Sequence, residues 1–371
     1  MLGGLTPQQF MRRHWQKAPL LVRQAFPGFR PLLPRAELMA LAARDDVQSR
    51  LVLRDASRGG PGWQLRHGPF ARRALPSLRT PDWTLLVQGV DLHHEAAHAL
   101  LRQFRFVPDA RIDDLMISYA TPGGGVGPHF DSYDVFLLQA QGRRRWRIGP
   151  LRDTRLQQGV PLKILTHFKP EQELILEPGD VLYLPLRYAH DGIADSSDCM
   201  TYSIGFRSPF RHELARELLQ RLADAAGAEG DDIYRDANQP AVAHPAAIPS
   251  ALHTYAREAL QQALRDPARL RCAVGEILSE PKPEVWFACN DAPSPKGWRR
   301  LWLDRRTRMM YDTNAIYVNG ESVALTGADA QCLRVLADQR WLARAMWQSG
   351  SGVLKRLIED WRQAGWVHAE L

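Results

Sequence analysis

The chain has 371 residues, and 48 Lys and Arg against 41 Asp and Glu give a formal net charge of +7. Apolar residues make up 45% and charged residues 24%, which excludes a disordered, collagen-like or coiled-coil chain. The four cysteines are scattered without a CxxC pair, which argues against a disulfide scaffold and favours a reducing cytoplasm. No run approaches ~18 consecutive apolar residues, so we expect no membrane span.

The first part of the chain, up to about Arg207, alternates short apolar runs with Gly and Pro. Helices are expected only near its start, from Thr6 to Lys17 and from Arg35 to Arg44. Many short strands separated by turn residues favour a β-sandwich or barrel. The predicted strands are Trp83–Val90, Leu115–Ala120, Val135–Leu138, Leu174–Leu176 and Val181–Leu184.

Helical spacing of apolar residues replaces this pattern from His212 to about Glu280. A polar stretch from Gly227 to Pro249 interrupts it, and Leu252 to Leu278 then predicts more helix. One helical pair cannot bury both of its apolar faces alone. We therefore expect these helices to pair with a second copy of the chain in a homodimer.

The last part follows a Pro-rich linker, Pro281 to Pro295. Met309–Tyr311 and Ile316–Val318 predict strands, and Asn319-Gly320 predicts a hairpin turn before Ser322–Leu325. Helices are expected around 332–336 and 353–361. This order resembles a winged helix, but acidic and basic residues alternate on its helices. Protein contact or packing is therefore favoured, and direct nucleic-acid binding is not expected.

A histidine and an aspartate two residues apart, His129 and Asp131, follow the glycine-rich segment 123–127. On a strand, residues i and i+2 point to the same face, so both side chains would converge on one point. With one distal histidine they would form the facial triad that binds non-haem iron(II). We assign this third position to His190, which follows the buried run 181–185. His93, His94, His98 and His167 compete for it, but their neighbours are typical of helix or loop positions.

An arginine on an apolar strand face marks a second part of the predicted site. In the run 143–148, Arg144 shares its face with Trp146 and Ile148, and the other arginines point to the opposite face. A buried unpaired charge is very costly, and a guanidinium fork suits a carboxylate. The residues alone leave two partners open, an internal Asp or Glu and the carboxylate of a bound 2-oxoglutarate.

Several motifs together carry a family resemblance: HWQK at 14–17, RIDDLMIS at 111–118, PGGGVGPH at 122–129, DSYDVF at 131–136, GRRRWR at 142–147, EPGD at 177–180 and YSIGFR at 202–207. The sequence resembles the JmjC-type ribosomal oxygenases, and among them the bacterial YcfD-type arginine hydroxylases. The match is dense in the first region and looser beyond it.

The resemblance implies an α+β chain with a double-stranded β-helix core of the cupin-like JmjC type at 1–208. A helical dimerisation region at 209–280 and a winged-helix-like C-terminal domain at 281–371 would follow. It implies Fe(II), O2 and 2-oxoglutarate, which is converted to succinate and carbon dioxide. The implied substrate is the β-carbon of an arginine in the sixteenth large-subunit ribosomal protein.

Site residues follow from the resemblance by position. They are His129, Asp131 and His190 for the metal, Arg144 and Ser118 for 2-oxoglutarate, and Asp114, Met116, Tyr133 and Ser203 for the substrate arginine. The residues themselves agree with a cationic substrate, because either Asp113 or Asp114 could stand at a pocket rim and pair with a guanidinium. Tyr133, two residues beyond Asp131 on the expected strand, could hold the arginine stem.

Three other functions remain open at this level. A JmjC lysine demethylase, or a hydroxylase of another ribosomal or translation protein, would use the same iron chemistry. A non-catalytic cupin-like binding protein would lack part of the triad or the basic residue, and this sequence keeps all four positions. A nucleic-acid-binding regulator would act through the C-terminal domain.

Overall fold

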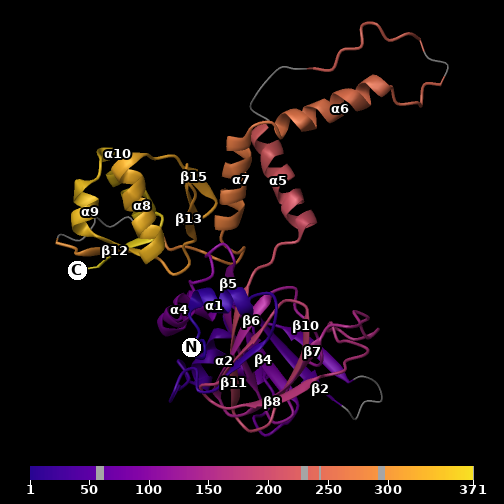
Figure 1. Ribbon diagram of the computed structural model, residues 1–371, viewed down its shortest axis with the longest axis vertical. Coiled ribbons are helices and arrows are strands. Elements are labelled where there is room, and N and C mark those ends of the chain that lie inside the picture. Colours follow the sequence, from indigo (N-terminus) through magenta and orange to yellow (C-terminus); the bar gives the residue numbers. More distant parts are fainter. Residues whose placement is uncertain (56–61, 227–232, 242–243, 291–296, 371) are drawn as a thin grey trace. The chain divides into compact units, whose positions relative to one another are not determined.

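The computed structural model describes residues 1–55, 62–226, 233–241, 244–290 and 297–370 (Figure 1). The chain forms two compact units, 1–208 and 209–371. The division into three domains, with a boundary at 280, stays a prediction. Among the described residues, no helix combines the length and the apolar character needed to cross a membrane.

Two antiparallel sheets build the first unit. The smaller sheet has the order β10 (Tyr188–Ala194), β7 (Arg144–Pro150) and β8 (Gln172–Leu176). The larger sheet has the order β1 (Leu20–Val22), β9 (Val181–Leu184), β6 (Asp134–Gln141), β11 (Cys199–Phe206), β5 (Ile112–Ala120), β4 (Trp83–Val87), β2 (Ser49–Arg54) and β3 (Trp63–His67).

Apolar side chains from both sheets meet in one buried cluster. Val135 and Leu182 come from the larger sheet, and Trp146, Ile148 and Leu176 come from the smaller one. Because side chains alternate along a strand, the cluster takes alternate apolar residues of β6, β7 and β9. Two packed antiparallel sheets are the arrangement expected of a double-stranded β-helix.

The opposite face of the larger sheet is covered by the helices of the first unit. These are α1 (Pro7–Arg13), α2 (Arg35–Leu41), α3 (Val90–His93) and α4 (Glu95–Arg102), and a short 3-10 turn spans Arg72–Ala74. Phe10, Leu38 and Leu100 from these helices share a buried cluster with Phe136 and Tyr202 of the sheet. The larger sheet therefore has two distinct faces. Its outer face packs against the helices, and its inner face carries the site.

Several predicted boundaries of the first unit were wrong, for local backbone reasons. Helix α1 starts at the predicted Thr6 cap, where a capping box with Gln9 forms, but it ends at Arg13. Gln16 has a φ of 56°, which a continuing helix to Lys17 could not accommodate. Strand β4 ends at Val87 because Gly89 (φ 62°) turns the chain into the unpredicted helix α3. Helix α4 was not predicted either.

Three helices open the second unit, α5 (Arg211–Ala226), α6 (Ser250–Ala263) and α7 (Pro267–Ser279). The helix predicted from Leu252 to Leu278 is broken at Asp266-Pro267, where the Asp266 carboxylate caps α7. Residues 227–232 and 242–243 of the predicted polar stretch, and 291–295 of the predicted linker, lie outside the described residues.

The rest of the second unit has two small sheets and three helices. One sheet has the order β16 (Trp341–Ala343), β12 (Arg300–Leu303) and β17 (Val367–Glu370), and the other β13 (Met309–Tyr311), β14 (Ile316–Val318) and β15 (Glu321–Val323). The helices are α8 (Gly327–Gln339), α9 (Arg344–Ser349) and α10 (Gly352–Gln363). Strands β13 and β14 have the predicted bounds, and positive φ at Asn319 and Gly320 forms the predicted turn. Strands β12, β16 and β17 and helix α9 were not predicted.

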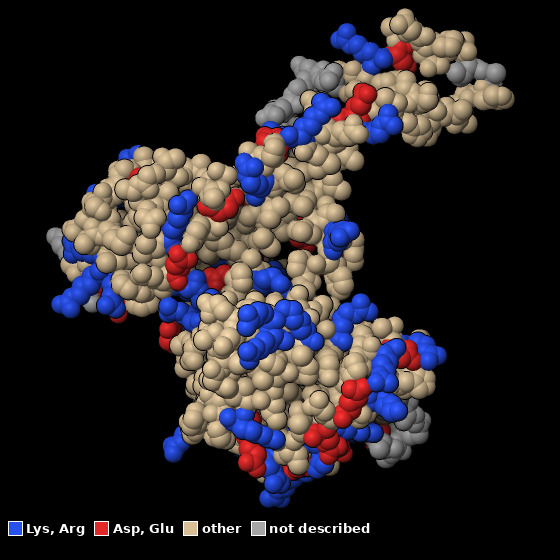
Figure 2. All heavy atoms as spheres, in the orientation of Figure 1, with Lys and Arg blue, Asp and Glu red and all other residues tan. Residues whose placement is uncertain are grey.

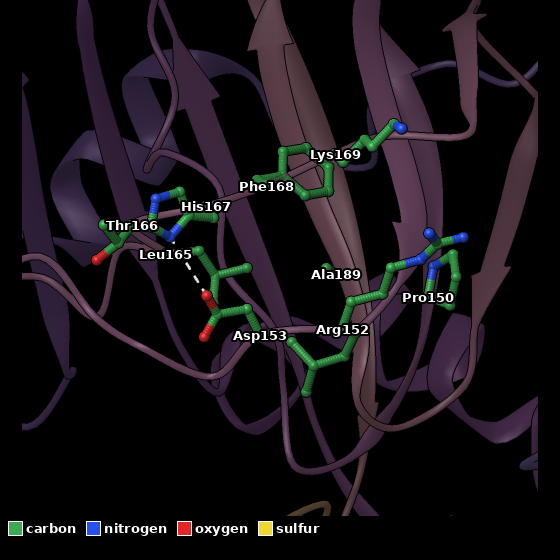
Figure 3. A pocket seen from close by; sticks show the side chains of 10 residues that line it. Pro150, Arg152, Asp153, Leu165, Thr166, His167, Phe168, Lys169 and Ala189 are labelled. Carbon is green, nitrogen blue, oxygen red and sulfur yellow. Dashed lines mark hydrogen bonds and ion pairs between the residues drawn. The ribbon is translucent and has the colours of Figure 1, made fainter.

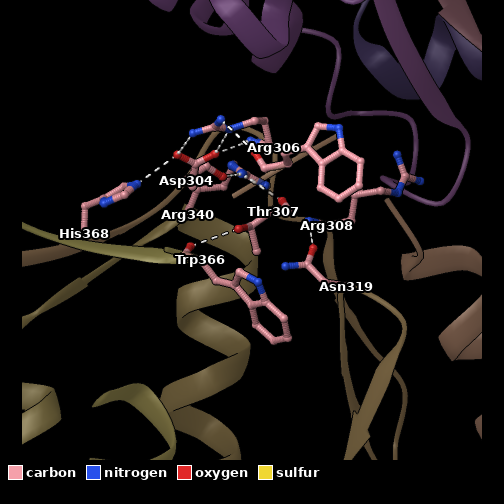
Figure 4. Close-up of polar contacts among 9 residues, drawn as sticks. Asp304, Arg306, Thr307, Arg308, Asn319, Arg340, Trp366 and His368 are labelled. Carbon is pink, nitrogen blue, oxygen red and sulfur yellow. Dashed lines mark hydrogen bonds and ion pairs between the residues drawn. The ribbon is translucent and has the colours of Figure 1, made fainter. Parts of the chain in front are cut away.

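A buried carboxylate, Asp304, organises the start of this last part (Figure 4). It accepts hydrogen bonds from Arg306 Nε at 2.7 Å and pairs with His368 Nε2 at 2.8 Å, while Arg340 donates to the carbonyl of Asp304. Burial alone raises the pKa of Asp304, but the bonds from Arg306 and His368 outweigh it and hold this pKa below its usual range. A lowered pKa means that the cluster stabilises the fold above the ordinary pKa of Asp and loses that effect as the pH falls.

Basic and acidic side chains both occur over the visible face of each unit (Figure 2). Lys and Arg outnumber Asp and Glu in the chain as a whole. On this face the two signs are interspersed, which is typical of a solvated surface.

Candidate active site

His129 and His190 are held together by their own main chains. The amide of His129 donates to the carbonyl of His190 at 2.9 Å, and the reverse bond is 2.8 Å. This isolated antiparallel bridge brings the imidazole centroids to 4.2 Å. The carbonyl of Asp131 accepts from the amide of Arg187 at 2.8 Å, which fixes the third residue beside them.

The imidazoles point their Nε2 atoms at a common place. His129 Nδ1 lies 2.8 Å from the carbonyl of Gly127, and His190 Nδ1 lies 2.9 Å from the carbonyl of Tyr188. A carbonyl can only accept, so each Nδ1 carries a proton, and in the neutral ring the lone pair is on Nε2. His190 Nε2 is 3.6 Å from Asp131 Oδ2. Within the described part of the chain, these three residues alone form a group whose ligand atoms lie close enough to share a metal, all within 4.8 Å.

The electrostatics favour the same chemistry. Burial, and next the neighbouring His129, lower the pKa of His190 to about 4. The imidazole is therefore neutral near neutral pH, which is the form that coordinates a metal. Two imidazole nitrogens and a carboxylate are a donor set that suits a first-row divalent ion such as iron(II).

The strand expected under this motif is absent. His129 belongs only to the bridge with His190, and Asp131 and Tyr133 lie in the connection before β6 begins at Asp134. His190 lies within β10, where we expected the chain to leave a strand. The side chains converge because of the backbone bridge, so the three residues lie together for a different reason than the i, i+2 argument gave.

Arg144 is buried in the same site with most of its hydrogen-bonding capacity unused. It is 5% exposed, and Nη1 donates to Ser118 Oγ at 3.3 Å. Its Nε and Nη2 are buried and have no partner among the described residues. The expected alternation holds, since Arg144 shares the inner face with buried Trp146 and Ile148, while Arg145 on the other face pairs with Glu173 and Asp195. No carboxylate among the described residues therefore satisfies Arg144.

Trp146 adds a third unused donor on the same face. Its Nε1 is buried without a partner in the described structure, and its ring lies 5.6 Å from the Arg144 guanidinium and 5.8 Å from the His190 ring. A Cβ at Gly192 would lie 2.6 Å from the indole, so the ring packs against bare backbone of β10. Unsatisfied buried donors beside a metal-ligand set fit an anionic ligand such as a dicarboxylate.

The residues expected to bind the substrate share the inner face of the larger sheet. Asp114 and Met116 alternate with buried apolar residues along β5, and Ser203 of β11 pairs with Met116. Asp114 Oδ2 accepts from the Gly89 amide at 3.0 Å. Tyr133 stands over this face with 38% of its surface exposed. Of the two candidate aspartates, Asp113 instead lies 3.3 Å from Arg207 Nε.

Sequence reasoning missed Gly205, which leaves space between these residues. A Cβ added there would lie 3.8 Å from Asp114 Oδ1 and 3.9 Å from Tyr133 Cε2. The backbone of Gly205 is not in the left-handed region, so its conformation would also allow a residue with a side chain. The signal was the glycine inside a strand run, which often marks a place where a ligand approaches closely.

A second hollow lies at the end of the smaller sheet (Figure 3). It has a volume of about 420 Å3 and is lined by Pro150–Asp153, Leu165–Lys169 and Ala189. Three of its lining side chains are already paired, since Asp153 contacts His167 at 3.2 Å and Arg152 pairs with Glu171. The candidate metal ligands are not among its lining residues, so we assign it no part of the site.

Comparison with known proteins agrees with this geometry. The family profile described as JmjC domain matches residues 99–214. Ribosomal protein uL16 3-hydroxylase of Escherichia coli is 39% identical over 289 residues, which cover 76% of this chain and 74% of that protein. The chain belongs to the JmjC-domain ribosomal oxygenase family. A probable ribosomal oxygenase of Haemophilus influenzae is 35% identical over 55% of this chain and 50% of its own.

Solved structures place this ribosomal oxygenase in the same fold over its full length. The crystal structure of E. coli YcfD covers 99% of both chains with a TM-score of 0.85 and 33% identity. A complex of that protein with cobalt and 2-oxoglutarate gives a TM-score of 0.81 and the same coverage. The α+β fold with a JmjC, cupin-like β core is thereby confirmed. The winged-helix and dimerisation assignments stay predictions.

Gly205→Leu is expected to reduce kcat/KM for an arginine-containing peptide by at least about 100-fold, because the side chain would fill the space between Asp114 and Tyr133. Gly205→Ala should keep most activity, since its Cβ makes only ordinary contacts. Steady-state kinetics on both variants, with 2-oxoglutarate affinity measured alongside, checks this. Wild-type activity in Gly205→Leu would show that the substrate does not bind between Asp114 and Tyr133.

Proposed function

We propose that this protein is an Fe(II)- and 2-oxoglutarate-dependent oxygenase that hydroxylates the β-carbon of an arginine in uL16, the sixteenth large-subunit ribosomal protein. The observation that carries the proposal is the buried guanidinium of Arg144, which has no anionic partner in the described part of the chain and lies in the same site as the His129, Asp131 and His190 group. The 39% identity to the E. coli uL16 3-hydroxylase supports the substrate.

Iron(II) and 2-oxoglutarate would supply the oxidising chemistry, in which O2 places one oxygen atom in the substrate C–H bond and the other in succinate, with release of carbon dioxide. His129, Asp131 and His190 would hold the metal, and the facial arrangement leaves coordination positions open. Arg144 would bind the distal carboxylate of 2-oxoglutarate through its unused Nε and Nη2, and Ser118 would orient the guanidinium through the 3.3 Å bond.

The remaining residues of the inner face would select the substrate side chain. Asp114, anchored by Gly89, would accept from the guanidinium, and Tyr133 would cover its planar stem. Met116 and Ser203, paired across β5 and β11, would form the floor. Holding the head group fixes where the stem carbons lie, so one C–H bond is presented for reaction and scattered oxidation is avoided.

The decisive experiment is incubation of the full-length protein with Fe(II), 2-oxoglutarate, O2 and peptides of uL16, followed by mass spectrometry. Hydroxylation adds one oxygen atom to an arginine, and fragmentation locates it on the β-carbon. Methylated lysine peptides belong in the same assay, because loss of a methyl group would indicate the alternative demethylase activity. No mass change in any peptide would overturn the proposal.

Arginine should be strongly preferred over lysine at the reactive position. An ammonium can pair with Asp114 but loses the planar stacking and the fork geometry. We expect a matched lysine peptide to react at least about tenfold more slowly, and Asp114→Asn to lose about 10- to 100-fold in kcat/KM on the arginine peptide. Asp113→Asn is the matched control, because Asp113 pairs with Arg207. Equal rates on the two peptides would refute the arginine pocket.

We infer that the protein is a homodimer formed by its second unit. Helix α6 buries none of its residues, and it leaves Leu252, Leu260 and the adjacent Leu264 39%, 50% and 45% exposed at helical spacing. Leu219 of α5 is 43% exposed as well. An uncovered apolar stripe of this kind is suited to two-fold pairing with its own copy.

Light scattering is expected to give twice the chain mass at micromolar concentration. Leu260→Glu should shift the protein to monomers, because it puts a charge on the stripe. Gln262→Glu adds the same charge on another side of α6 and should leave the dimer intact. A monomeric wild type would contradict the proposal.

We also propose a cytoplasmic site of action, where newly made ribosomal proteins are present. The C-terminal part from 281 would act as a winged-helix-like packing or protein-contact domain without direct nucleic-acid binding. A salt-dependent affinity for RNA or DNA would argue against that assignment.

A further inference from the structure

Arg50 places an unexpected cation on the inner face of the larger sheet. It is the second residue of β2 and is paired with Leu86 of β4, which is paired in turn with Ser118 of β5. Residues in one cross-strand row point to the same face. Arg50 therefore shares the face of Ser118, whose hydroxyl accepts from Arg144 in the site.

The Nε of Arg50 is a buried donor without an acceptor among the described residues. Its neighbours on the inner face, Val52 and Leu86, are buried and apolar. Four residues further along β2, the guanidinium of Arg54 lies over the Trp63 ring at 5.4 Å, which shows how an arginine on this strand is otherwise satisfied.

Arg50 lies on the same face of the sheet as the predicted substrate pocket. Its partner Leu86 pairs with Ser118, which lies two residues beyond Met116 on the same face of β5. The inner face thus presents a carboxylate, Asp114, and a cation, Arg50. A substrate arginine needs the first and would be repelled by the second, so Arg50 must serve another part of the substrate.

Reaction at a β-carbon brings the substrate main chain into the site, because Cβ is bonded directly to Cα. The adjacent peptide carbonyls lose water on entry and need donors. Arg50 offers a buried donor that has no acceptor, and the entering backbone has acceptors that need donors.

We propose that Arg50 binds a main-chain carbonyl oxygen of the substrate peptide and so sets how the backbone lies across the inner face. This inference rests on the proposed function, since it assumes a peptide that reacts at its β-carbon. Arg50 is then a specificity-determining residue for the peptide and takes no part in binding 2-oxoglutarate.

The test measures binding without turnover. A fluorescent arginine-containing uL16 peptide is titrated against the full-length protein loaded with cobalt(II) and 2-oxoglutarate, and anisotropy gives its Kd. Arg50→Met keeps the apolar stem and is expected to weaken peptide binding about 10- to 100-fold. Arg50→Gln, whose side-chain donor is shorter, should also bind the peptide more weakly. The Kd of 2-oxoglutarate should not change.

Arg54→Met is the matched control, because it removes the next arginine on the same strand face and should leave the peptide Kd unchanged. A second peptide, with Asn and Gln in place of its Asp and Glu, should show the same dependence on Arg50. Loss of that dependence would mean that a side-chain carboxylate is the ligand and would overturn the carbonyl assignment.

Unchanged peptide binding in Arg50→Met, with tight binding by the wild type, would overturn this inference and leave the proposed function standing. A wild type that binds neither peptide would refute the proposed function itself, and the inference with it.

Discussion

Replacement of His129, Asp131 or His190 by alanine is expected to abolish hydroxylation while the N-terminal unit stays folded. Three protein ligands are the minimum for a facial triad, and loss of an outer partner of a metal ligand alone costs about 10- to 100-fold. We therefore expect losses well beyond about 100-fold. The fold should persist because the bonds between His129 and His190 are main-chain bonds, which alanine retains.

The measurement combines product mass spectrometry, metal content and thermal unfolding of each variant. His167→Ala is the matched control, since His167 is exposed and contacts only Asp153 among the interactions described above. Wild-type turnover in any one of the three alanine variants would remove that residue from the metal site. A collapse of the unfolding temperature would instead show a structural role.

Arg144→Met is expected to raise the KM for 2-oxoglutarate by about 30-fold to several thousand-fold. Truncating one partner of a buried hydrogen-bonded charge pair commonly costs about 2–5 kcal/mol. The KM of Arg144→Lys for 2-oxoglutarate should lie between those of Arg144→Met and the wild type, because an ammonium restores the charge but not the bidentate fork. Arg145→Met is the control on the same strand, since Arg145 faces outward to Glu173 and Asp195.

Thermal unfolding gives an independent readout for Arg144. In the wild type, 2-oxoglutarate should raise the unfolding temperature through its binding to the folded state. In Arg144→Met this shift should vanish, while the protein without cosubstrate should unfold at the same or a higher temperature, because a buried unpartnered charge has been removed. An unchanged KM and an unchanged ligand shift would show that Arg144 serves another purpose.

The local sequence pattern was sufficient to predict strands and turns where burial and turn residues act over a few consecutive positions. The buried run Val181–Leu184 and the strands on either side of Asn319-Gly320 have the predicted bounds or nearly so. The alternation around Arg144 was also read correctly, because strand geometry alone decides which side chains share a face. By contrast, the break at Asp266-Pro267 was overlooked within a long helical pattern.

Features that depend on pairing between distant segments could not be read from the sequence. The bridge between His129 and His190 joins two segments far apart in the chain, so the motif seemed to require a strand that does not exist. Arg50 and Gly205 became visible only when the register of β2, β4, β5 and β11 was known. A cation or a glycine in a strand run has many ordinary explanations until its neighbours across the sheet are identified.

The backbone bridge between the two histidines makes the spacing of the nitrogen donors a property of the fold and independent of the ion that occupies the site. Such a preformed bite does little to discriminate among first-row divalent ions, whose affinities rise towards copper in the usual order. Which ion occupies the site in a cell then depends on the supply of each ion as well as on the ligand types. Removal and replacement of the ion would also need no refolding, so an inactive, wrongly metallated molecule remains recoverable.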